Sequence, residues 1–240
     1  MRAKELAAAL FENGGAGPTR DIPLNQGFLR DLAVMRRAAP DSRVWPPELD
    51  EFPLDARGRF RIDRRHVFAI AERAIHTPED RWASAQLHCA IVIWGAPPGR
   101  DMTRAFRPLA DAAAPEHLTQ ALKVVRGEGP ISAYCALSKT GGRLHVSGLG
   151  PSFFTKFLYF GGWDAKHLLD QPLIMDKRVV KSLKALTKES WTNDNIDDYR
   201  RFLELARDVA HAAETTEDVV EWRLWQPSED ELDDSVEAVR

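Results

Sequence analysis

The sequence lacks most of the short motifs that identify common enzyme classes. Its 240 residues contain no GxxxxGKS/T phosphate-binding loop, no HExxH zinc helix and no GxSxG nucleophile elbow. The seven histidines are scattered without ligand spacing, and neither Cys89 nor Cys135 belongs to a CxxC or Cys/His cluster. We therefore expect no metal site, no cofactor and no thiol nucleophile.

Long hydrophobic runs are also missing. The longest uncharged apolar run, Cys89–Trp94, is far too short to cross a bilayer. The N-terminal helix contains Lys4 and Glu5, and it lacks the long apolar core of a signal peptide. Two cysteines in apolar helical contexts fit a reducing compartment. These features predict a cytoplasmic protein that does not enter a membrane.

Negative charge is concentrated in the last residues. The chain has a net charge of −3, but the segment 227–240 alone carries −5, so the remainder is positive. Between Lys139 and Lys188, nine basic residues outnumber three acidic ones. Such asymmetry is typical of a polyanion-binding face with an acidic tail elsewhere. The alternative is an ordinary solvated surface followed by a disordered tail.

Five arginines between residues 57 and 65 precede or begin a helix that Asp63 can cap. Cations at a helix N-terminus oppose the helix dipole, so an anionic partner there would be favourable. Local pairing with Asp55 and Asp63 explains the cluster equally well. The pattern leaves phosphate contact and local pairing open.

Strand patterns are scarce. A run of alternating apolar and polar residues long enough to form a strand occurs only near Phe60–Ile62. The remaining apolar spacing is helical and predicts an all-α protein with roughly ten helices. The segment from Glu79 to Trp94 is so apolar that we expect a buried central helix. Expected helices start at the N-terminus, after Asp63 and at Pro151, and cover residues 25–38, 79–94, 100–110, 115–125, 130–137, 177–188, 196–213 and 216–225.

A glycine hairpin precedes the helix that begins at Pro151. The run Val146-Ser147-Gly148-Leu149-Gly150 has the h-x-G-h-G pattern of a helix-hairpin-helix motif. Its two glycines permit a tight turn with positive φ and let a phosphate approach the backbone, while amides at the helix start attract the anion. Binding would be independent of sequence. An ordinary structural turn is the alternative.

Two charged residues follow this hairpin. Lys156 lies among aromatic residues of the hairpin helix, and Asp176 ends an apolar run just before a basic helix. Through GLGPSFFTKFLYF and PLIMDKRVV, residues 144–186 resemble the helix-hairpin-helix DNA glycosylase superfamily, and they look most like bacterial proteins with an 8-oxoguanine DNA glycosylase-like (OGG) fold. The resemblance implies two helical lobes around a cleft. It also implies an N-terminal extension (1–56), a glycosylase-like domain (57–226) and an acidic tail (227–240).

The resemblance also implies roles for both charged residues. In the superfamily an aspartate lies near the sugar, and Asp176 matches it; bifunctional members add a lysine. In the commonest members that lysine stands where this chain has Ser152, whereas Thr155-Lys156 matches more divergent branches, one helical turn later. The alternatives are an N-cap role for Asp176 and a surface or phosphate-binding role for Lys156.

The residue types themselves support this chemistry independently of the resemblance. A flipped base exposes its C1′–N bond to a pocket, and cleavage builds positive charge on the sugar. A carboxylate such as Asp176 can stabilise that charge and orient a water or an amine. A lysine out of contact with water can lose its proton, attack C1′ and form a Schiff base that leads to strand cleavage. Lys156, at the edge of an aromatic arc, is the candidate nucleophile.

Further residues complete the predicted site. We expect DNA contacts from Gly148, Leu149, Gly150, Ser152, Lys177, Arg178 and Lys181. Plates of the base pocket are expected from Phe153, Phe154, Trp94 and Trp163, with Trp45 as a weaker candidate. Each aromatic residue is equally compatible with a place in the hydrophobic core.

The sequence thus predicts a monomeric DNA glycosylase of the bacterial nucleoid that acts on double-stranded DNA containing an altered base. Whether the enzyme also carries out a Schiff-base lyase step is left open by the sequence. The base could be an oxidised purine, an alkylated base or a hypermodified base of phage DNA, which would make the protein a defence factor. Two other hypotheses remain, a non-catalytic helix-hairpin-helix DNA-binding module and a helical interaction protein whose hairpin is only a turn.

Overall fold

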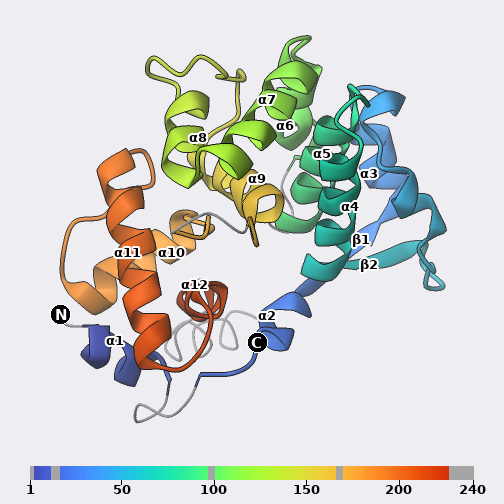
Figure 1. Ribbon diagram of the computed structural model, residues 1–240. Helices are drawn as coiled ribbons and strands as arrows, with labels where there is room; N and C mark the ends of the chain where they lie inside the picture. The colour runs from blue at the N-terminus through green and yellow to red at the C-terminus, as the bar shows by residue number, and fades with distance from the viewer. Residues whose placement is uncertain (1–2, 12–16, 97–100, 166–169, 227–240) are drawn as a thin grey trace.

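The computed structural model describes residues 3–11, 17–96, 101–165 and 170–226, and helices dominate these ranges (Figure 1). The all-α prediction is therefore confirmed. The helices are α1 (Ala3–Leu10), α2 (Asp21–Leu24), α3 (Leu32–Ala38), α4 (Arg64–His76), α5 (Ala83–Gly95), α6 (Met102–Phe106), α7 (Ala114–Gly127), α8 (Pro130–Leu137), α9 (Pro151–Gly162), α10 (Lys177–Thr187), α11 (Ile196–Ala212) and α12 (Glu217–Trp225). Short 3-10 helices cover Ser42–Val44, Pro47–Glu51 and Arg107–Ala110.

One small sheet interrupts the helices. Strand β1 (Gly27–Asp31) pairs antiparallel with β2 (Arg59–Asp63), which confirms the strand expected near Phe60–Ile62. The helix expected over 25–38 is wrong in its first part, because β1 occupies this stretch and α3 begins only at Leu32. The partner strand lies about thirty residues away, and local periodicity does not detect such a pairing. Gly27 is required here, since a Cβ would lie 2.7 Å from Asp63 Cβ.

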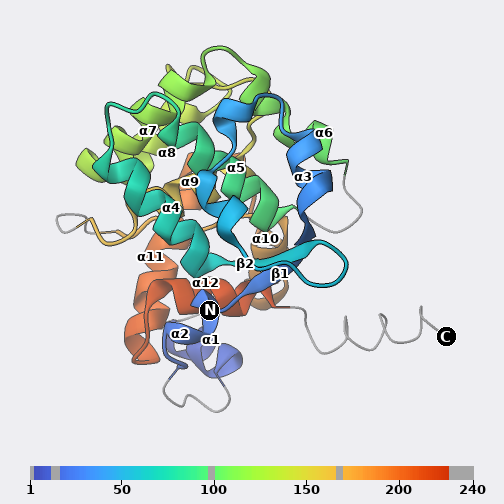
Figure 2. The ribbon, with the colours of Figure 1, turned by 90° about the vertical axis from the view of Figure 1, so that its right-hand side faces the viewer.

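The helices form two lobes, as the resemblance implies. In one lobe α4, α5, α7, α8 and α9 pack against one another. In the other, α10, α11 and α12 pack together with α1, so the N-terminal helix lies beside the last helices of the chain (Figures 1 and 2). Asp63 caps α4 by accepting a hydrogen bond from the His66 amide, which confirms the predicted cap.

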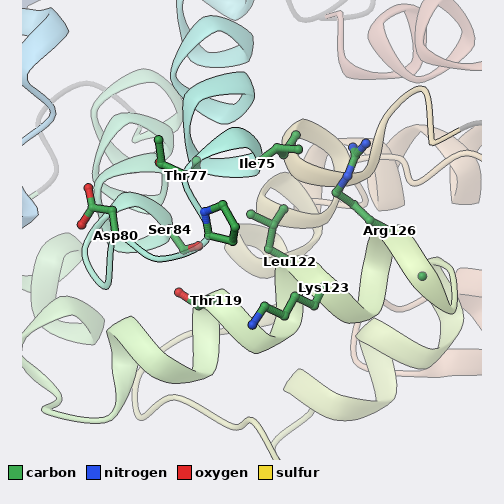
Figure 3. A pocket seen from close by; sticks show the side chains of 11 residues that line it. Ile75, Thr77, Asp80, Ser84, Thr119, Leu122, Lys123 and Arg126 are labelled. Atoms are coloured by element: carbon green, nitrogen blue, oxygen red, sulfur yellow. The ribbon is translucent and has the colours of Figure 1, made fainter.

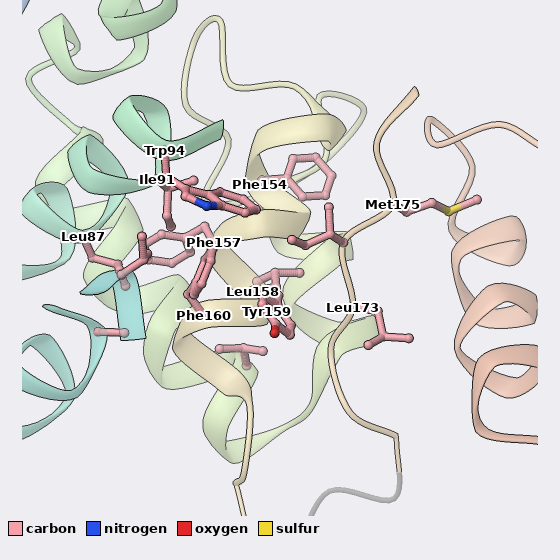
Figure 4. Close-up of a cluster of buried hydrophobic side chains, with 14 of the residues drawn as sticks. Leu87, Ile91, Trp94, Phe154, Phe157, Leu158, Tyr159, Phe160, Leu173 and Met175 are labelled. Atoms are coloured by element: carbon pink, nitrogen blue, oxygen red, sulfur yellow. The ribbon is translucent and has the colours of Figure 1, made fainter. Parts of the chain in front are cut away.

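The core of the first lobe lies where α5 meets α9. Leu87, Ile91 and Trp94 of α5 contact the aromatic face of α9, which includes Phe157 and Phe160 (Figure 4). Burial on nearly every side of α5 confirms the predicted central helix, although it begins at Ala83 and not at Glu79. The hydrophobic contact makes α5 and α9 a rigid pair, and both helices place one end at the same cavity.

No described helix is long and apolar enough to span a bilayer. The acidic tail expected over residues 227–240 lies outside the described residues.

Candidate active site

A cavity of about 690 Å³ lies between the two lobes. Its walls come from the end of α5, the hairpin with the start of α9, the start of α10, strand β1 and the end of α12. Both Lys156 and Asp176 line it, although they are 20 residues apart in sequence. A cavity of this size suits a small ligand such as a nucleotide.

Lys156 and Asp176 form an ion pair at this cavity. The Lys156 Nζ donates to Asp176 Oδ2 at 2.7 Å and to the Ser152 carbonyl at 3.0 Å. It also lies 5.6 Å from the centre of the Phe153 ring. The side chains are 5% and 13% exposed, so most water is excluded from the pair while the cavity still reaches it.

Asp176 uses its two oxygens for two purposes. Oδ1 accepts hydrogen bonds from the Arg178 and Val179 amides and caps α10, while Oδ2 accepts from Lys156. The capping role and the contact with Lys156 therefore coexist. Burial pushes the pKa of Asp176 upward, but the Lys156 charge and hydrogen bond, helped by the two amides, hold the pKa below its ordinary value. Asp176 is consequently a carboxylate near neutral pH.

Two neighbouring side chains, those of Thr155 and Asn193, fix the position of this pair. The Thr155 hydroxyl accepts from the Met175 amide at 3.2 Å, which joins α9 to the residue before Asp176. Asn193 Nδ2 donates to Ser152 Oγ and to the Met175 carbonyl. Asn193 was not predicted, because it comes from a polar loop with no local signal of its partners.

Gly95 gives the lysine side chain room. A Cβ at Gly95 would lie 3.1 Å from both Cδ and Cε of Lys156. The sequence suggested only a helix end at Gly95, whereas the structure shows that the lysine stem passes directly over it. The close approach between α5 and α9 therefore helps to aim the amine at Asp176.

Aromatic rings line the cavity, and only some of them were predicted. Trp94 and Phe153 lie there as expected, and Phe28 and Trp225 join them. The Phe28 ring centre is 6.1 Å from that of Trp94 and 6.2 Å from that of Trp225. Phe28 was missed because β1 was mistaken for helix. Trp225 belongs to the aromatic run at the end of α12, which was a usable signal.

Three predicted aromatic residues lie elsewhere. Phe154 packs edge-on against Tyr134 on another face of α9. Trp163 lies at the far end of α9, beneath the Arg20 guanidinium at 4.5 Å, and buried Trp45 donates to Asp50. On a helix, residues three apart share a face, so Phe153 accompanies Lys156 whereas its neighbour Phe154 turns away. None of the three lines the cavity that holds Lys156 and Asp176.

The hairpin has one left-handed glycine. Gly148 has φ +82°, a conformation that favours glycine, and it is exposed. Gly150 is the extended N-cap of α9 with φ −93°, so Gly148 supplies the positive φ of the hairpin turn. No atom lies within 4 Å of a Cβ built at Gly150. The glycine therefore leaves the space in front of the first turn of α9 open. Leu149 is buried and anchors the hairpin.

Several predicted DNA-contact residues surround the cavity. Ser152, Lys177 and Arg178 line it, and Arg178 stacks over Trp225 at 4.8 Å. Lys181 is exposed one turn further along α10. Basic side chains therefore stand next to the cavity mouth, on the helix that Asp176 caps.

A second ion pair lies behind Trp94. Arg64 Nη1 donates to Glu221 Oε2 at 2.7 Å, and both side chains are 0% exposed. Arg64 also stacks over Trp94 and donates to Gln26, whose carbonyl accepts from the Trp94 indole. Burial raises the pKa of the Glu221 carboxyl, and Arg64 opposes that rise. The network orients a wall of the cavity.

The arginines near the start of α4 fall into two groups, those that pair locally at the surface and one that is buried. Arg59 pairs with Asp55 and Arg61 pairs with Asp63, as the local-pairing alternative expected. Arg64 does neither, because it points inward to Glu221. The sequence offered no sign that one member of this cluster is fully buried.

Residues 22–225 match the protein family described as "Putative 8-oxoguanine DNA glycosylase OGG-like protein". The match covers most of the chain, so the protein belongs to this family, as the resemblance suggested. It begins at residue 22 and thus includes β1, which supplies Phe28 to the cavity. No curated protein and no solved structure matches the chain in the corresponding comparisons. Membership indicates a DNA glycosylase.

Proposed function

We propose that the protein removes an altered base from double-stranded DNA after flipping the nucleotide into the cavity between the lobes. One observation carries this proposal: the Lys156–Asp176 pair lies in a cavity bordered by the glycine hairpin and by aromatic rings. The hairpin and the basic start of α10 would hold the phosphates. Trp94, Phe153 and Trp225 would contact the flipped base.

Asp176 is the residue that stabilises the sugar in this proposal. As the C1′–N bond breaks, its electron pair leaves with the base and positive charge develops on the sugar. The Asp176 carboxylate, charged and largely desolvated, stabilises that charge more strongly than a carboxylate in water would. Its cap hydrogen bonds to α10 hold it in place during the reaction.

Lys156 is the proposed nucleophile of a lyase step. In the free protein its Nζ donates a hydrogen bond to Asp176. Attack requires that it release one proton, which passes through Asp176 to the departing base. The C1′–Nζ bond forms while the C1′–N bond of the base breaks, and the sugar then opens to a Schiff base. The 2.7 Å contact favours this route, because the proton acceptor already touches the amine.

The test is incubation of the protein with duplexes that each carry one altered base, followed by alkali to cleave abasic sites. The family description makes 8-oxoguanine the first base to test. An alkylated base and a hypermodified pyrimidine follow, the last for a role in defence against phage. Wild-type protein should release one of them, and Asp176→Asn should reduce the rate by about 10³-fold.

Absence of base release from every duplex would reject the enzyme. If such a protein still binds duplex DNA in a salt-dependent way, it is the non-catalytic DNA-binding module. Asparagine is a suitable control at this position, because it keeps the N-cap of α10 while it removes the charge.

Borohydride trapping tests the lyase step separately. A Schiff base between Lys156 and the sugar should be reduced to a stable protein–DNA adduct that Lys156→Gln cannot form. Base release without any trapped adduct would show a monofunctional glycosylase and would remove Lys156 from the role of nucleophile.

A further inference from the structure

The exposed side of α10 carries a row of cations that begins at the cavity between the lobes. Helix α10 contains no acidic residue, and its exposed basic side chains are Lys177, Arg178, Lys181 and Lys184. Lys177 and Arg178 also line the cavity. Residues three or four apart lie on one side of a helix, so these cations run from the cavity mouth along α10. We call these four residues the basic row.

The protein itself leaves part of the basic row without a counterion. Neither Lys177 nor Lys184 has a carboxylate partner in the part of the chain that the structure describes. Asp176, directly before the helix, is already engaged by Lys156 and by the amides that it caps. Like charges at these helical spacings repel one another, so an anionic partner along α10 would be favourable.

Helix α12 ends beside the basic row. Trp225 is its last residue and lines the same cavity, and the Arg178 guanidinium lies over the Trp225 ring at 4.8 Å. Helices α10 and α12 also pack together. The acidic segment 227–240 follows after one further residue, Gln226, so it starts next to the cavity mouth.

The segment 227–240 has the charge and the length to cover the basic row. It contains six acidic residues and one basic residue, a balance of −5. Its residues can span roughly 45 Å when extended, whereas the 11 residues of α10 rise only about 16 Å. Because the segment is joined to α12, its effective concentration at the basic row is high.

Another basic cavity, in the lobe that does not contain α12, is less suited to this segment. Its volume is about 420 Å³, and it lies between α4, α5 and α7. Figure 3 shows that Lys123 and Arg126, which line it, point in different directions, and Arg126 donates to the Gly161 carbonyl at 3.1 Å. These two cations form no row, so we expect the acidic segment at α10 and not here.

We propose that the segment 227–240 binds the basic row of α10 and covers the mouth of the cavity between the lobes, so that DNA must displace it. Its carboxylates take the place of phosphates at the same cations, and the two anions therefore exclude each other. Docking of the segment is a property of the free protein. Only the competition with DNA rests on the proposed function.

Docking is measured without DNA, by a nitroxide attached to the full-length protein through Ser235→Cys in a Cys135→Ser background. The remaining cysteine, Cys89, is buried. At low ionic strength the label should broaden the amide signal of Lys177 and leave that of Lys123 sharp, and about 0.5 M salt should restore Lys177 because it screens the charges. A label that leaves Lys177 sharp, or affects both lysines alike, would overturn the proposal.

Competition is measured as the affinity for an undamaged duplex. The triple variant Glu229→Gln/Glu231→Gln/Glu237→Gln removes three charges from the acidic segment. It should bind the duplex about tenfold more tightly than wild type at low salt, because fewer contacts must be broken before phosphates reach the basic row. An affinity equal to that of wild type would contradict the competition.

A second triple variant controls for net charge. Glu72→Gln/Glu79→Gln/Glu204→Gln removes three exposed charges outside the segment, and its affinity should stay within about twofold of wild type. Equal tightening in both triple variants would show that net charge alone acts, and the competition would be rejected. If no variant binds the duplex at all, the proposed function fails, whereas the nitroxide result still decides whether the segment docks.

Discussion

Two ion pairs in the described part of the chain have both side chains largely shielded from water, and they differ in what can reach them. Lys156 with Asp176 and Arg64 with Glu221 both have N–O distances of 2.7 Å. The first pair keeps 5% and 13% side-chain exposure at a cavity, whereas the second is 0% exposed on both sides. Contact distance therefore does not distinguish the pair proposed to react from the structural one. Access from the cavity does.

The two cations also differ in their partners. Arg64 donates to Gln26, Tyr159 and Glu221, and arginine keeps its proton in proteins. The Lys156 amine donates to the Ser152 carbonyl and to Asp176, and a lysine can release its proton. The first pair is thus suited to chemistry, and the second to holding Trp94 in place.

The largest expected effect comes from replacing Lys156 and Asp176 by apolar residues of similar size. Lys156→Met/Asp176→Leu should reduce base release by more than about 10³-fold, because both groups proposed to react are gone. Its stability should fall by only about 1 kcal/mol, for the lost cap of α10. The measurements are single-turnover base release and thermal unfolding.

Arg64→Met/Glu221→Leu is the matched control for that replacement. A fully buried pair replaced by apolar residues typically changes stability little or raises it. This variant should keep base release within about tenfold of wild type, since it affects only the support of Trp94. If this variant loses activity as completely as the first, the distinction between the two pairs is wrong.

Breaking only the buried pair should cost more stability than any surface change. Arg64→Leu leaves the Glu221 carboxylate buried without its cation, and the expected loss is about 4 kcal/mol in urea unfolding at pH 8. Burial raises the folded-state pKa of Glu221, so its carboxylate takes up a proton as the pH falls and then carries no unpaired charge. The loss should therefore be smaller at pH 5.5 than at pH 8.

The neighbour Arg65 provides the control for this prediction. Its pair with Asp21 is largely exposed, with side-chain exposures of 47% and 72%. Arg65→Leu should change stability by less than about 1 kcal/mol. Equal losses of stability in Arg64→Leu and Arg65→Leu would show that burial of the ion pair does not set its contribution.

A third buried group, His88, has no ionic partner and should respond to pH. Both ring nitrogens lack a hydrogen bond within the described part of the chain, and burial lowers the pKa from 6.5 to about 4. Because the unfolded chain then binds more protons, stability falls as pH decreases from 6.5 toward 4. At pH 5 the loss is about 2 kcal/mol relative to neutral pH. His88→Phe should abolish that portion of the acid sensitivity in unfolding experiments at pH 5 and 7.5, and an unchanged pH profile would contradict it.

The smallest expected effect concerns the aim of Lys156. Gly95→Ala places a methyl group 3.1 Å from the lysine stem, which must shift and lengthen the contact with Asp176. Base release should fall about tenfold, since small misplacements of reacting groups are costly. Gly127 ends α7 as Gly95 ends α5, and no atom lies within 4 Å of its Cβ position. Gly127→Ala should therefore leave base release unchanged, and equal rates for the two variants would argue against Gly95 as a positioning residue.

Local patterns in the sequence were sufficient for most helices. Apolar spacing located α4, α10 and α11, and Asp63 marked the start of α4. Alternation revealed β2, but β1 was mistaken for helix, because the pairing of two strands distant in sequence is not contained in the local pattern of either segment. The error removed Phe28 from the predicted site.

The same division applies to the candidate site. Its charged residues and its hairpin follow from motifs, so Asp176, Lys156 and Gly148 could be named in advance, and their catalytic and binding roles remain predictions. The aromatic residues could not be assigned, because any buried ring suits both a core and a pocket. Phe153 reached the cavity and Phe154 did not, although they are adjacent.

The sequence by itself therefore determined the helical class, the hairpin and the two residues that form the ion pair at the cavity. Only the tertiary structure decided that Lys156 touches Asp176, that Asn193 and Gly95 hold them together, and that Arg64 is buried with Glu221. The physical reason is that helices arise from contacts a few residues apart, whereas a cavity is built where distant segments meet. Which charged side chains come together away from water therefore depends on how these distant segments pack.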